Sequence, residues 1–230
     1  MAQILPALIF DLDGTLTDSK PGILGCLVKT LQERGMPVPG SLERFIGPPV
    51  EEWVAYLLPE GTREEHVALA SQYRACYDRE GWSNNSVFAG VRQMLLQLRE
   101  VGYSLYVCTS KHERFAVRIM DAFELSPLFE AIYGDRLEYP IHTKTDLLAR
   151  VLSDCGLDRA RAWMIGDRSF DFGAAKANGV RSMAVGWGYG AAHEWALADA
   201  VAATPCDVSA MLSGESRLPL QALPQPIALG

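Results

Sequence analysis

The sequence lacks several patterns that mark common classes of protein. It contains no run of about 18 apolar residues, so no segment predicts a transmembrane helix. Its first residues carry no basic cluster, and the apolar stretch there ends at Asp11, so a secretory signal peptide is not expected. The formal net charge is −7 over 230 residues, which argues against a nucleic-acid partner bound through its phosphates.

Cysteine and histidine are also scarce. The cysteines are odd in number and none is close to another in sequence, which favours free thiols in a reducing cytoplasm over a disulfide framework or a zinc site. They are Cys26, Cys76, Cys108, Cys155 and Cys206. The four histidines have no metal-ligand spacing and are expected at the surface. We therefore expect a cytoplasmic protein without a membrane or nucleic-acid partner.

What is present is the composition of an ordinary globular protein, with 49% hydrophobic and 21% charged residues. From residue 87 onward, short β-type blocks alternate with helical patterns. Strands are predicted over 103–108, 130–134, 161–165 and 181–185, and helices over 91–101, 113–123, 144–155 and 172–179. Such alternation predicts an α/β fold, a Rossmann-like parallel sheet with helices on both faces.

Residues 17–86 break this alternation, because they contain one helical pattern after another. An apolar stripe runs from Ile23 to Leu31, and Thr62 with Glu65 forms a capping-box pattern. We predict a small all-helical cap domain at 17–86, inserted into a core of 1–16 and 87–212. Residues 81–86 would form the return linker, and 213–230 a peripheral tail rich in proline and glutamine.

One short segment, ALIFDLDGTLTDS at 7–19, indicates chemistry. The apolar block ALIF is typical of a strand that is buried on both faces. Alternate residues of a strand point to the same side, so Asp11 and Asp13 would lie together where the strand ends. Gly14 allows a tight turn there. Two carboxylates held so close repel each other, which predicts a metal ion or a proton between them.

Other polar residues follow the ends of the predicted strands or begin a helix. Because ligands of open parallel sheets bind beyond the carboxyl ends of the strands, these residues form one candidate site. Its carboxylates suit a hard cation, and its hydroxyl groups and lysine suit a phosphoryl group. The set is Asp11, Asp13, Thr109, Ser110, Lys144, Asp167 and Asp171.

These residues resemble the four ordered motifs of the haloacid dehalogenase-like hydrolases. The motifs are DLDGTL at 11–16, CTS at 108–110, Lys144, and GDRSFD at 166–171. The helical insertion after the first motif is similar to the C1 cap of that family. More narrowly, the segments at 45–52, 166–180 and 186–190 resemble the phosphoglycolate phosphatase and 5′-nucleotidase branch.

The resemblance implies a role for each residue. Asp11 would be the nucleophile that forms an aspartyl-phosphate, and Asp13 the acid and then the base. Mg²⁺ would be held by Asp11, Asp13 through its backbone carbonyl, and Asp167, with Asp171 ordering the site. Thr109, the Ser110 amide and Lys144 would hold the phosphoryl oxygens, with Lys144 followed by Thr145 and not by the family's usual proline. Lys111 and Arg168 adjoin the motifs and are further candidates for substrate recognition.

Several alternatives stay open at this point. A dehalogenase of the same fold does not need Asp13 as an acid, whereas a phosphomutase would keep both aspartates. A phosphate-binding regulatory module without catalysis is a third reading. The pattern GWGYGA at 186–191 also matches a dinucleotide-binding turn, but no clear second strand with an acidic residue follows it.

The substrate is expected to be a small phosphorylated metabolite. Trp53, Tyr56, Trp187 and Tyr189 could offer aromatic faces to a nucleobase, which favours nucleoside 5′-monophosphates. Phosphoglycolate is the second choice, and Arg44 is the one cationic residue of segment 44–56 that could bind its carboxylate. A monomer or a homodimer is expected.

Overall fold

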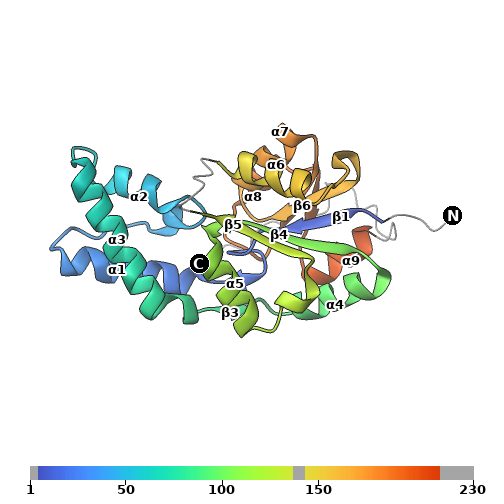
Figure 1. The fold of residues 1–230 in the computed structure, drawn as a ribbon, viewed down its shortest axis with the longest axis horizontal. Helices are drawn as coiled ribbons and strands as arrows, with labels where there is room; N and C mark the ends of the chain where they lie inside the picture. The colour runs from blue at the N-terminus through green and yellow to red at the C-terminus, as the bar shows by residue number, and fades with distance from the viewer. Residues whose placement is uncertain (1–4, 137–142, 213–230) are drawn as a thin grey trace, which may run out of the picture.

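The structure is a computed structural model of the 230-residue chain, and it describes residues 5–136 and 143–212. Its core is a six-stranded parallel sheet with the strand order β5-β4-β1-β6-β7-β8 (Figure 1). The strands are β1 (Ala7–Phe10), β4 (Ser104–His112), β5 (Ala131–Asp135), β6 (Ala162–Gly166), β7 (Arg181–Val185) and β8 (Ala200–Ala202). The α/β fold with a parallel sheet that the sequence predicts is therefore confirmed.

Helices cover both faces of this sheet. They are α4 (Val91–Val101), α5 (Glu113–Ala122), α6 (Lys144–Asp154), α7 (Ser169–Asn178), α8 (Ala192–Trp195) and α9 (Pro205–Leu212). The packing on the two faces of strand β1 explains why its four residues are all apolar. Leu8 and Phe10 pack into one core with α4 and α5, whereas Ile9 packs into the opposite core with α6 and α7. The strand at the centre of the sheet is thus apolar on both sides.

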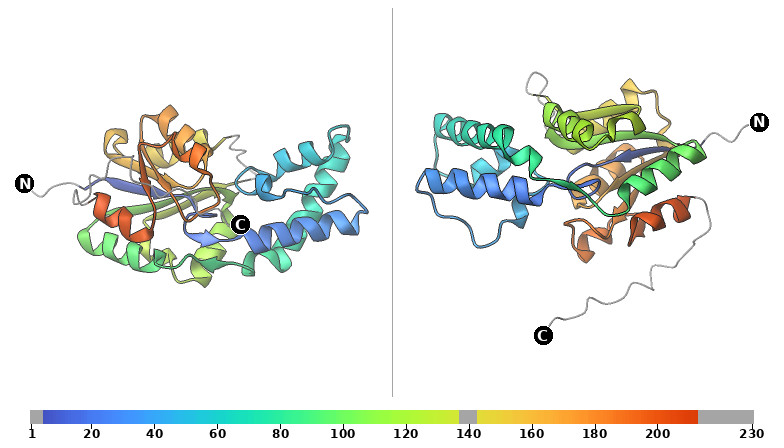
Figure 2. Two further views of the ribbon diagram at one scale, coloured as in Figure 1. Left: turned by 180° about the vertical axis from the view of Figure 1, so that it is seen from behind. Right: turned by 90° about the horizontal axis from the view of Figure 1, so that it is seen from below.

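A helical segment leaves the core after β1 and returns before α4. It contains α1 (Lys20–Glu33), α2 (Val50–Leu57) and α3 (Arg63–Arg79), and all three views place it at one end of the long axis (Figures 1 and 2). Its two connections to the core pair with each other as the antiparallel strands β2 (Thr17–Asp18) and β3 (Ser86–Val87). Strands of two residues have no periodicity, so the sequence did not predict them. The helical character of 17–86 agrees with the sequence, and its independence as a domain stays a prediction.

Local sequence signals explain where several helices begin and end. Thr62 and Glu65 form the predicted capping box at the start of α3. Gly102 ends α4 with a φ of 104°, a left-handed conformation that glycine adopts without strain. The described residues also form four single 3₁₀ turns, at Glu43–Phe45, Gly81–Ser83, Ser126–Leu128 and Arg159–Arg161. Within the described residues, the helices are all too short or too polar to cross a bilayer.

Two strands differ from the prediction. Strand β4 runs four residues beyond Cys108, because its pairing with β5 resumes at His112 after an irregularity, so Thr109 and Ser110 lie inside the strand. Strand β8 occupies 200–202, where the sequence pattern was weak, because it pairs with β7 at the edge of the sheet. The predicted tail at 213–230 lies outside the described residues.

Candidate active site

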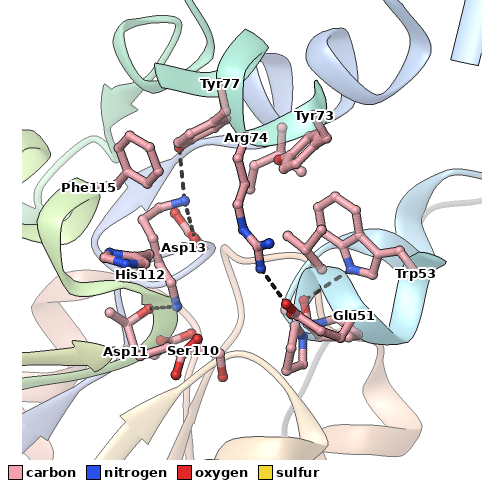
Figure 3. A pocket seen from close by; sticks show the side chains of 18 residues that line it. Asp11, Asp13, Glu51, Trp53, Tyr73, Arg74, Tyr77, Ser110, His112 and Phe115 are labelled. Carbon is pink, nitrogen blue, oxygen red and sulfur yellow. Dashed lines mark hydrogen bonds and ion pairs between the residues drawn. The ribbon is translucent and has the colours of Figure 1, made fainter. Parts of the chain in front are cut away.

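The candidate site lies where the central strands end. Strand β1 lies between β4 and β6, so Asp11 and Asp13 after β1, Thr109 and Ser110 in β4, and Asp167 after β6 meet at one edge of the sheet. Asp11, Asp13, Thr109 and Ser110 line a pocket between this edge and the helical segment (Figure 3). Gly14 makes the turn beyond the aspartates with a φ of 86°. The strand order thus assembles residues that are more than 150 positions apart.

Lys144 joins two of the aspartates. It begins α6, where Thr143 caps the helix by accepting a hydrogen bond from the amide of Asp146. The Nζ atom of Lys144 lies 2.6 Å from Asp11 Oδ1 and 2.8 Å from Asp171 Oδ1. Burial alone would lower the pKa of Lys144, but the charges of Asp11 and Asp171 raise it above its ordinary value. Lys144 is therefore charged beside Asp11, although Thr145 follows it in place of the family's usual proline.

Asp171 and Asp167 are both fully buried. Asp171 uses one oxygen to accept from the amide of Arg168 at the start of α7 and the other to meet Lys144. Asp167 accepts a hydrogen bond of 2.8 Å from the amide of Tyr189. Burial, with the charges of Asp171 and Asp11, raises the pKa of Asp167 well above its ordinary value. Ionised Asp167 is therefore costly unless a positive charge lies nearby.

The carboxylates fit a divalent cation. Asp11, Asp167 and Asp171 each offer one oxygen, and these oxygens lie within 4.8 Å of one another. Lys144 pairs with two members of this group, Asp11 and Asp171, so one ammonium group faces three buried carboxylates. Burial raises the pKa of Asp11 to about 6 even though Lys144 lowers it. Oxygen ligands with an excess of negative charge are the donors that Mg²⁺ prefers.

The loop after β7 closes over Asp167. A Cβ atom on Gly188 would lie 2.2 Å from the carbonyl oxygen of Gly14 and 2.4 Å from Asp167 Cβ, so no larger residue fits without movement. The short helix α8, with four residues, follows this loop. The glycines of 186–190 therefore serve close packing around Asp167, which argues against a dinucleotide-binding turn. The second strand that the sequence did not show does follow this loop, as β8.

Lys111 connects Asp13 to the helical segment. Its Nζ atom lies 2.8 Å from Asp13 Oδ2 and donates a hydrogen bond of 2.9 Å to the hydroxyl of Tyr77 in α3. Burial would lower the pKa of Lys111, but Asp13 and Tyr77 raise it. The other oxygen, Asp13 Oδ1, is buried and accepts no hydrogen bond from any residue that the structure describes. One oxygen of Asp13 is thus held in place and the other is available for proton transfer.

The two predicted arginines do not line this pocket. Arg44 is exposed and stacks over the ring of Tyr56, 3.7 Å from its centre. Arg168 binds Glu194 and the carbonyl oxygen of Ile46, so it ties the start of α7 to the helical segment. The arginine in the pocket is Arg74 of α3, which pairs with Glu51 at 2.5 Å (Figure 3).

The aromatic walls of the pocket also differ from expectation. Only Trp53 of the four expected aromatic residues lines it, because Tyr56 is exposed and Trp187 and Tyr189 are bound to Thr15 and Asp18. The remaining walls are Tyr73 and Tyr77 of α3 and Phe115 of α5 (Figure 3). His112 lines the pocket too and is not a plain surface residue. The sequence did contain a signal for the missed residues of α3. Tyr73 and Tyr77 are spaced to lie on one face of a helix, and the charged Arg74 follows Tyr73 directly.

A comparison with protein families agrees with this geometry. The family model for haloacid dehalogenase-like hydrolases matches residues 8–185, which include all seven residues of the candidate site. The chain therefore belongs to the haloacid dehalogenase-like hydrolase family.

Individual relatives carry different names. Tyrosine-protein kinase PtkA of Mycobacterium tuberculosis is 42% identical over 80% of this chain, which spans 63% of that relative's length. A 5′-nucleotidase of Pseudomonas aeruginosa is 37% identical over 82% of this chain and 86% of its own. A phosphoglycolate phosphatase of Caulobacter vibrioides is 32% identical over 78% of each chain.

Solved structures give the same fold. The crystal structure of a predicted phosphatase from Clostridium acetobutylicum has a TM-score of 0.85 and is 29% identical to this chain, with 92% of this chain and 100% of the other covered.

Proposed function

We propose that this protein hydrolyses phosphate monoesters through a phosphorylated aspartate. The observation that carries the proposal is the arrangement at the pocket floor. Asp11 lies beside Lys144, and Asp13 lies two residues further with one oxygen paired to Lys111 and the other without a partner among the described residues. This is the pairing of a nucleophile with an acid–base group that covalent phosphoryl transfer requires.

Each step uses a side chain of this chain. A carboxylate oxygen of Asp11 attacks phosphorus, and the bond from phosphorus to the leaving oxygen breaks as Asp13 protonates that oxygen. Asp13 then removes a proton from a water molecule, which attacks phosphorus and releases inorganic phosphate from Asp11. Thr109, Ser110 and Lys144 hold the phosphoryl oxygens, and Lys144 offsets part of their charge.

A magnesium ion would be held by Asp11, Asp167 and the backbone carbonyl of Asp13. Asp171 would order the site through its ion pair with Lys144. When bound, it supplies positive charge to the carboxylates and to the phosphoryl oxygens. We expect chelation with EDTA to abolish phosphate release, Mg²⁺ to restore it, and Ca²⁺ to fail, because calcium takes a larger and looser oxygen shell.

The same addition can be followed without an activity assay. Mg²⁺ should raise the melting temperature of the chelated protein, because it binds the folded carboxylates and not the unfolded chain. Full phosphate release after exhaustive chelation, together with an unchanged melting temperature, would rule out this metal site.

For the substrate, we propose a phosphate monoester with a flat, partly apolar leaving group, and nucleoside 5′-monophosphates first. Trp53, Tyr73, Tyr77 and Phe115 place aromatic surface beside the pocket, and stacking of a base on one such ring is worth roughly 1–3 kcal/mol. Phosphoglycolate is the second candidate. Its carboxylate would bind Arg74 in place of Glu51, since those two residues already form an ion pair at the pocket.

Replacement of Arg74 separates the two substrates. We expect Arg74→Ala to lower kcat/KM for phosphoglycolate by about 10- to 100-fold, because a hydrogen bond between charged groups is lost. The value for a nucleoside 5′-monophosphate should change by less than about threefold. Arg44→Ala is the matched control, because Arg44 lies outside the pocket and should affect neither substrate. A wild-type preference for phosphoglycolate that Arg74→Ala removes would reverse our ranking.

The similarity to a protein named as a tyrosine kinase supports a second candidate function, phosphoryl transfer to a protein hydroxyl group. An aspartyl-phosphate can pass its phosphoryl group to a hydroxyl acceptor as well as to water, which also keeps a phosphomutase open. Incubation with ATP labelled at the γ-phosphate and a tyrosine peptide distinguishes these activities. Labelled peptide formed faster than labelled phosphate would favour the kinase, and phosphate release without any acceptor favours the hydrolase.

A further inference from the structure

Two cysteines meet inside the helical segment. Cys26 lies on α1 and Cys76 on α3, neighbouring helices of this segment (Figure 2), and their Sγ atoms are 2.9 Å apart. Both side chains are buried, with 3% and 4% of their surface exposed. A disulfide bond is about 2.0 Å long, so a further approach of roughly 1 Å would join them. The sequence did not predict this contact, because 50 positions separate the two residues.

The backbone holds Cys26 in this position. A Cβ atom on Gly22 in α1 would lie 2.0 Å from the carbonyl oxygen of Gly81, and a Cβ atom on Gly81 would lie 2.7 Å from Cys26 Sγ. Glycine at both positions therefore lets α1 approach the turn that follows α3. Because this close packing exists before any bond forms, oxidation would need only the approach of roughly 1 Å between the two sulfur atoms.

The two thiols have different surroundings. The thiol of Cys76 donates to Cys26 and lies 3.2 Å from a carboxylate oxygen of Glu80. Burial and these contacts raise the pKa of Cys76 to about 12. Burial also raises the pKa of Cys26, the hydrogen bond from Cys76 acts to lower it, and the opposite charges of Glu80 and Lys29 raise and lower it in turn. Because Cys76 donates its thiol hydrogen to the sulfur of Cys26, the geometry places Cys26 to react first and Cys76 to react second.

A groove gives small molecules access to the pair. Its volume is about 340 Å³, and Cys26, Cys76, Lys29 and Glu80 are among the residues that line it. Lys29 pairs with Glu80 at 2.5 Å, so charged groups line the groove together with the two cysteines. A hydroperoxide is small enough to enter and supplies the two electron equivalents of oxidising power that a disulfide requires.

We infer that Cys26 and Cys76 are an oxidation site, at which a hydroperoxide forms a reversible disulfide between α1 and α3. Cys26 loses its proton, and its sulfur attacks one oxygen of hydrogen peroxide and becomes a sulfenic acid as the O–O bond breaks. The hydroxide that leaves takes up that proton and becomes water. The thiol of Cys76 then attacks that sulfur, the S–O bond breaks, and water leaves. Overall, two thiols lose two electrons and two protons, and one peroxide is reduced to two molecules of water.

The bond would act on the candidate active site through α3. Tyr77 follows Cys76 directly, and its hydroxyl accepts the hydrogen bond from Lys111, which pairs with Asp13. Drawing α3 toward α1 shifts Tyr77 relative to Lys111. The bond also closes a long loop, which restricts the unfolded chain. We therefore expect oxidation to raise the melting temperature by at least about 5 °C, and to change kcat/KM for phosphate monoesters.

The test is peptide mapping of the full chain. Reduced protein is treated with hydrogen peroxide at one to five equivalents, free thiols are alkylated, and the non-reduced digest is analysed by mass spectrometry. We expect a cross-linked pair of peptides that contain Cys26 and Cys76, and its loss after treatment with dithiothreitol. Cys206→Ser is the matched control, because Cys206 is exposed and should leave the cross-link unchanged.

The single variants test the order of reaction. Cys76→Ser should accumulate a sulfenic acid at Cys26 that dimedone traps, whereas Cys26→Ser should leave Cys76 largely reduced. The inference is overturned if wild-type Cys26 and Cys76 are both alkylated after peroxide treatment, or if they cross-link to other cysteines. It is also overturned if purified protein holds one zinc ion that thiol modification releases, because Cys26, Cys76 and Glu80 would then be metal ligands. None of these results depends on the proposed phosphatase activity.

Discussion

Asp11→Asn is expected to lower phosphate release by at least about 10³-fold without unfolding the protein. The amide is a poor nucleophile toward phosphorus, and it loses the charge that pairs with Lys144 at 2.6 Å. The change should be tolerated structurally, because asparagine has nearly the same shape as aspartate. Burial raises the pKa of Asp11 to about 6, so its charge is unfavourable to folding. Lys144 keeps Asp171 as its partner at 2.8 Å when Asp11 becomes neutral, so the metal-free variant should melt no lower than wild type.

The measurements are steady-state phosphate release and thermal melting in EDTA. Asp154→Asn provides the matched control, since it makes the same chemical change at the exposed end of α6 and should keep full activity. Acid-quenched wild-type enzyme should also carry phosphate on Asp11, and the variant should carry none. A folded Asp11→Asn protein that retains a tenth of wild-type activity would show that Asp11 is not the nucleophile.

Lys144→Met should reduce activity by at least about 10²-fold and destabilise the metal-free protein in a pH-dependent way. Methionine fills most of the space of the buried lysine side chain but leaves Asp11 and Asp171 without their ammonium partner. Removing one member of a buried ion pair costs about 3–5 kcal/mol. Because Lys144 lowers the pKa of Asp11, its loss should raise that pKa beyond about 6.

The sign of the pH dependence follows from that shift. Where the folded pKa of Asp11 exceeds its ordinary value of 3.8, the folded state binds the extra proton more tightly than the unfolded chain. The destabilisation should therefore be small near pH 4, increase as pH rises through the folded pKa, and be largest at pH 8. Urea denaturation in EDTA at these two pH values measures it. Lys176→Met, at an exposed position of α7, is the control. Equal destabilisation at both pH values would contradict a role for Lys144 in offsetting the carboxylates.

The site residues nearest the strands could be predicted from the sequence because their signals are local. Asp11, Asp13 and Gly14 follow an apolar block, and the structure places them at the end of β1. Thr109 and Asp167 follow similar blocks, so the rule that parallel strands end at one edge was enough to bring them together. Their chemical roles stay predictions, since placement alone does not test them.

Lys144 and Asp171 were harder to place, because each begins a helix and a helix start has many neighbours. The sequence placed both in the candidate set by their position near strand ends and helix starts, and a family resemblance implied their roles. The structure shows the contact that unites them, an ammonium group within 2.8 Å of two carboxylates. Arg44 shows the opposite case. Its segment pointed to the pocket, but its guanidinium group stacks on Tyr56 at the surface, whereas Arg74 reaches the pocket from α3.

The sequence by itself determined the α/β core, the helical insertion and the line of polar residues at the strand ends, because each depends on periodicity or on a few adjacent residues. Only the tertiary structure decided what faces the pocket from the helical segment and what meets inside it. Arg74, Tyr77 and Lys111 come together across two parts of the chain, and so do Cys26 and Cys76. Such contacts depend on how helices pack, and packing is a property of shapes in three dimensions that no short pattern encodes.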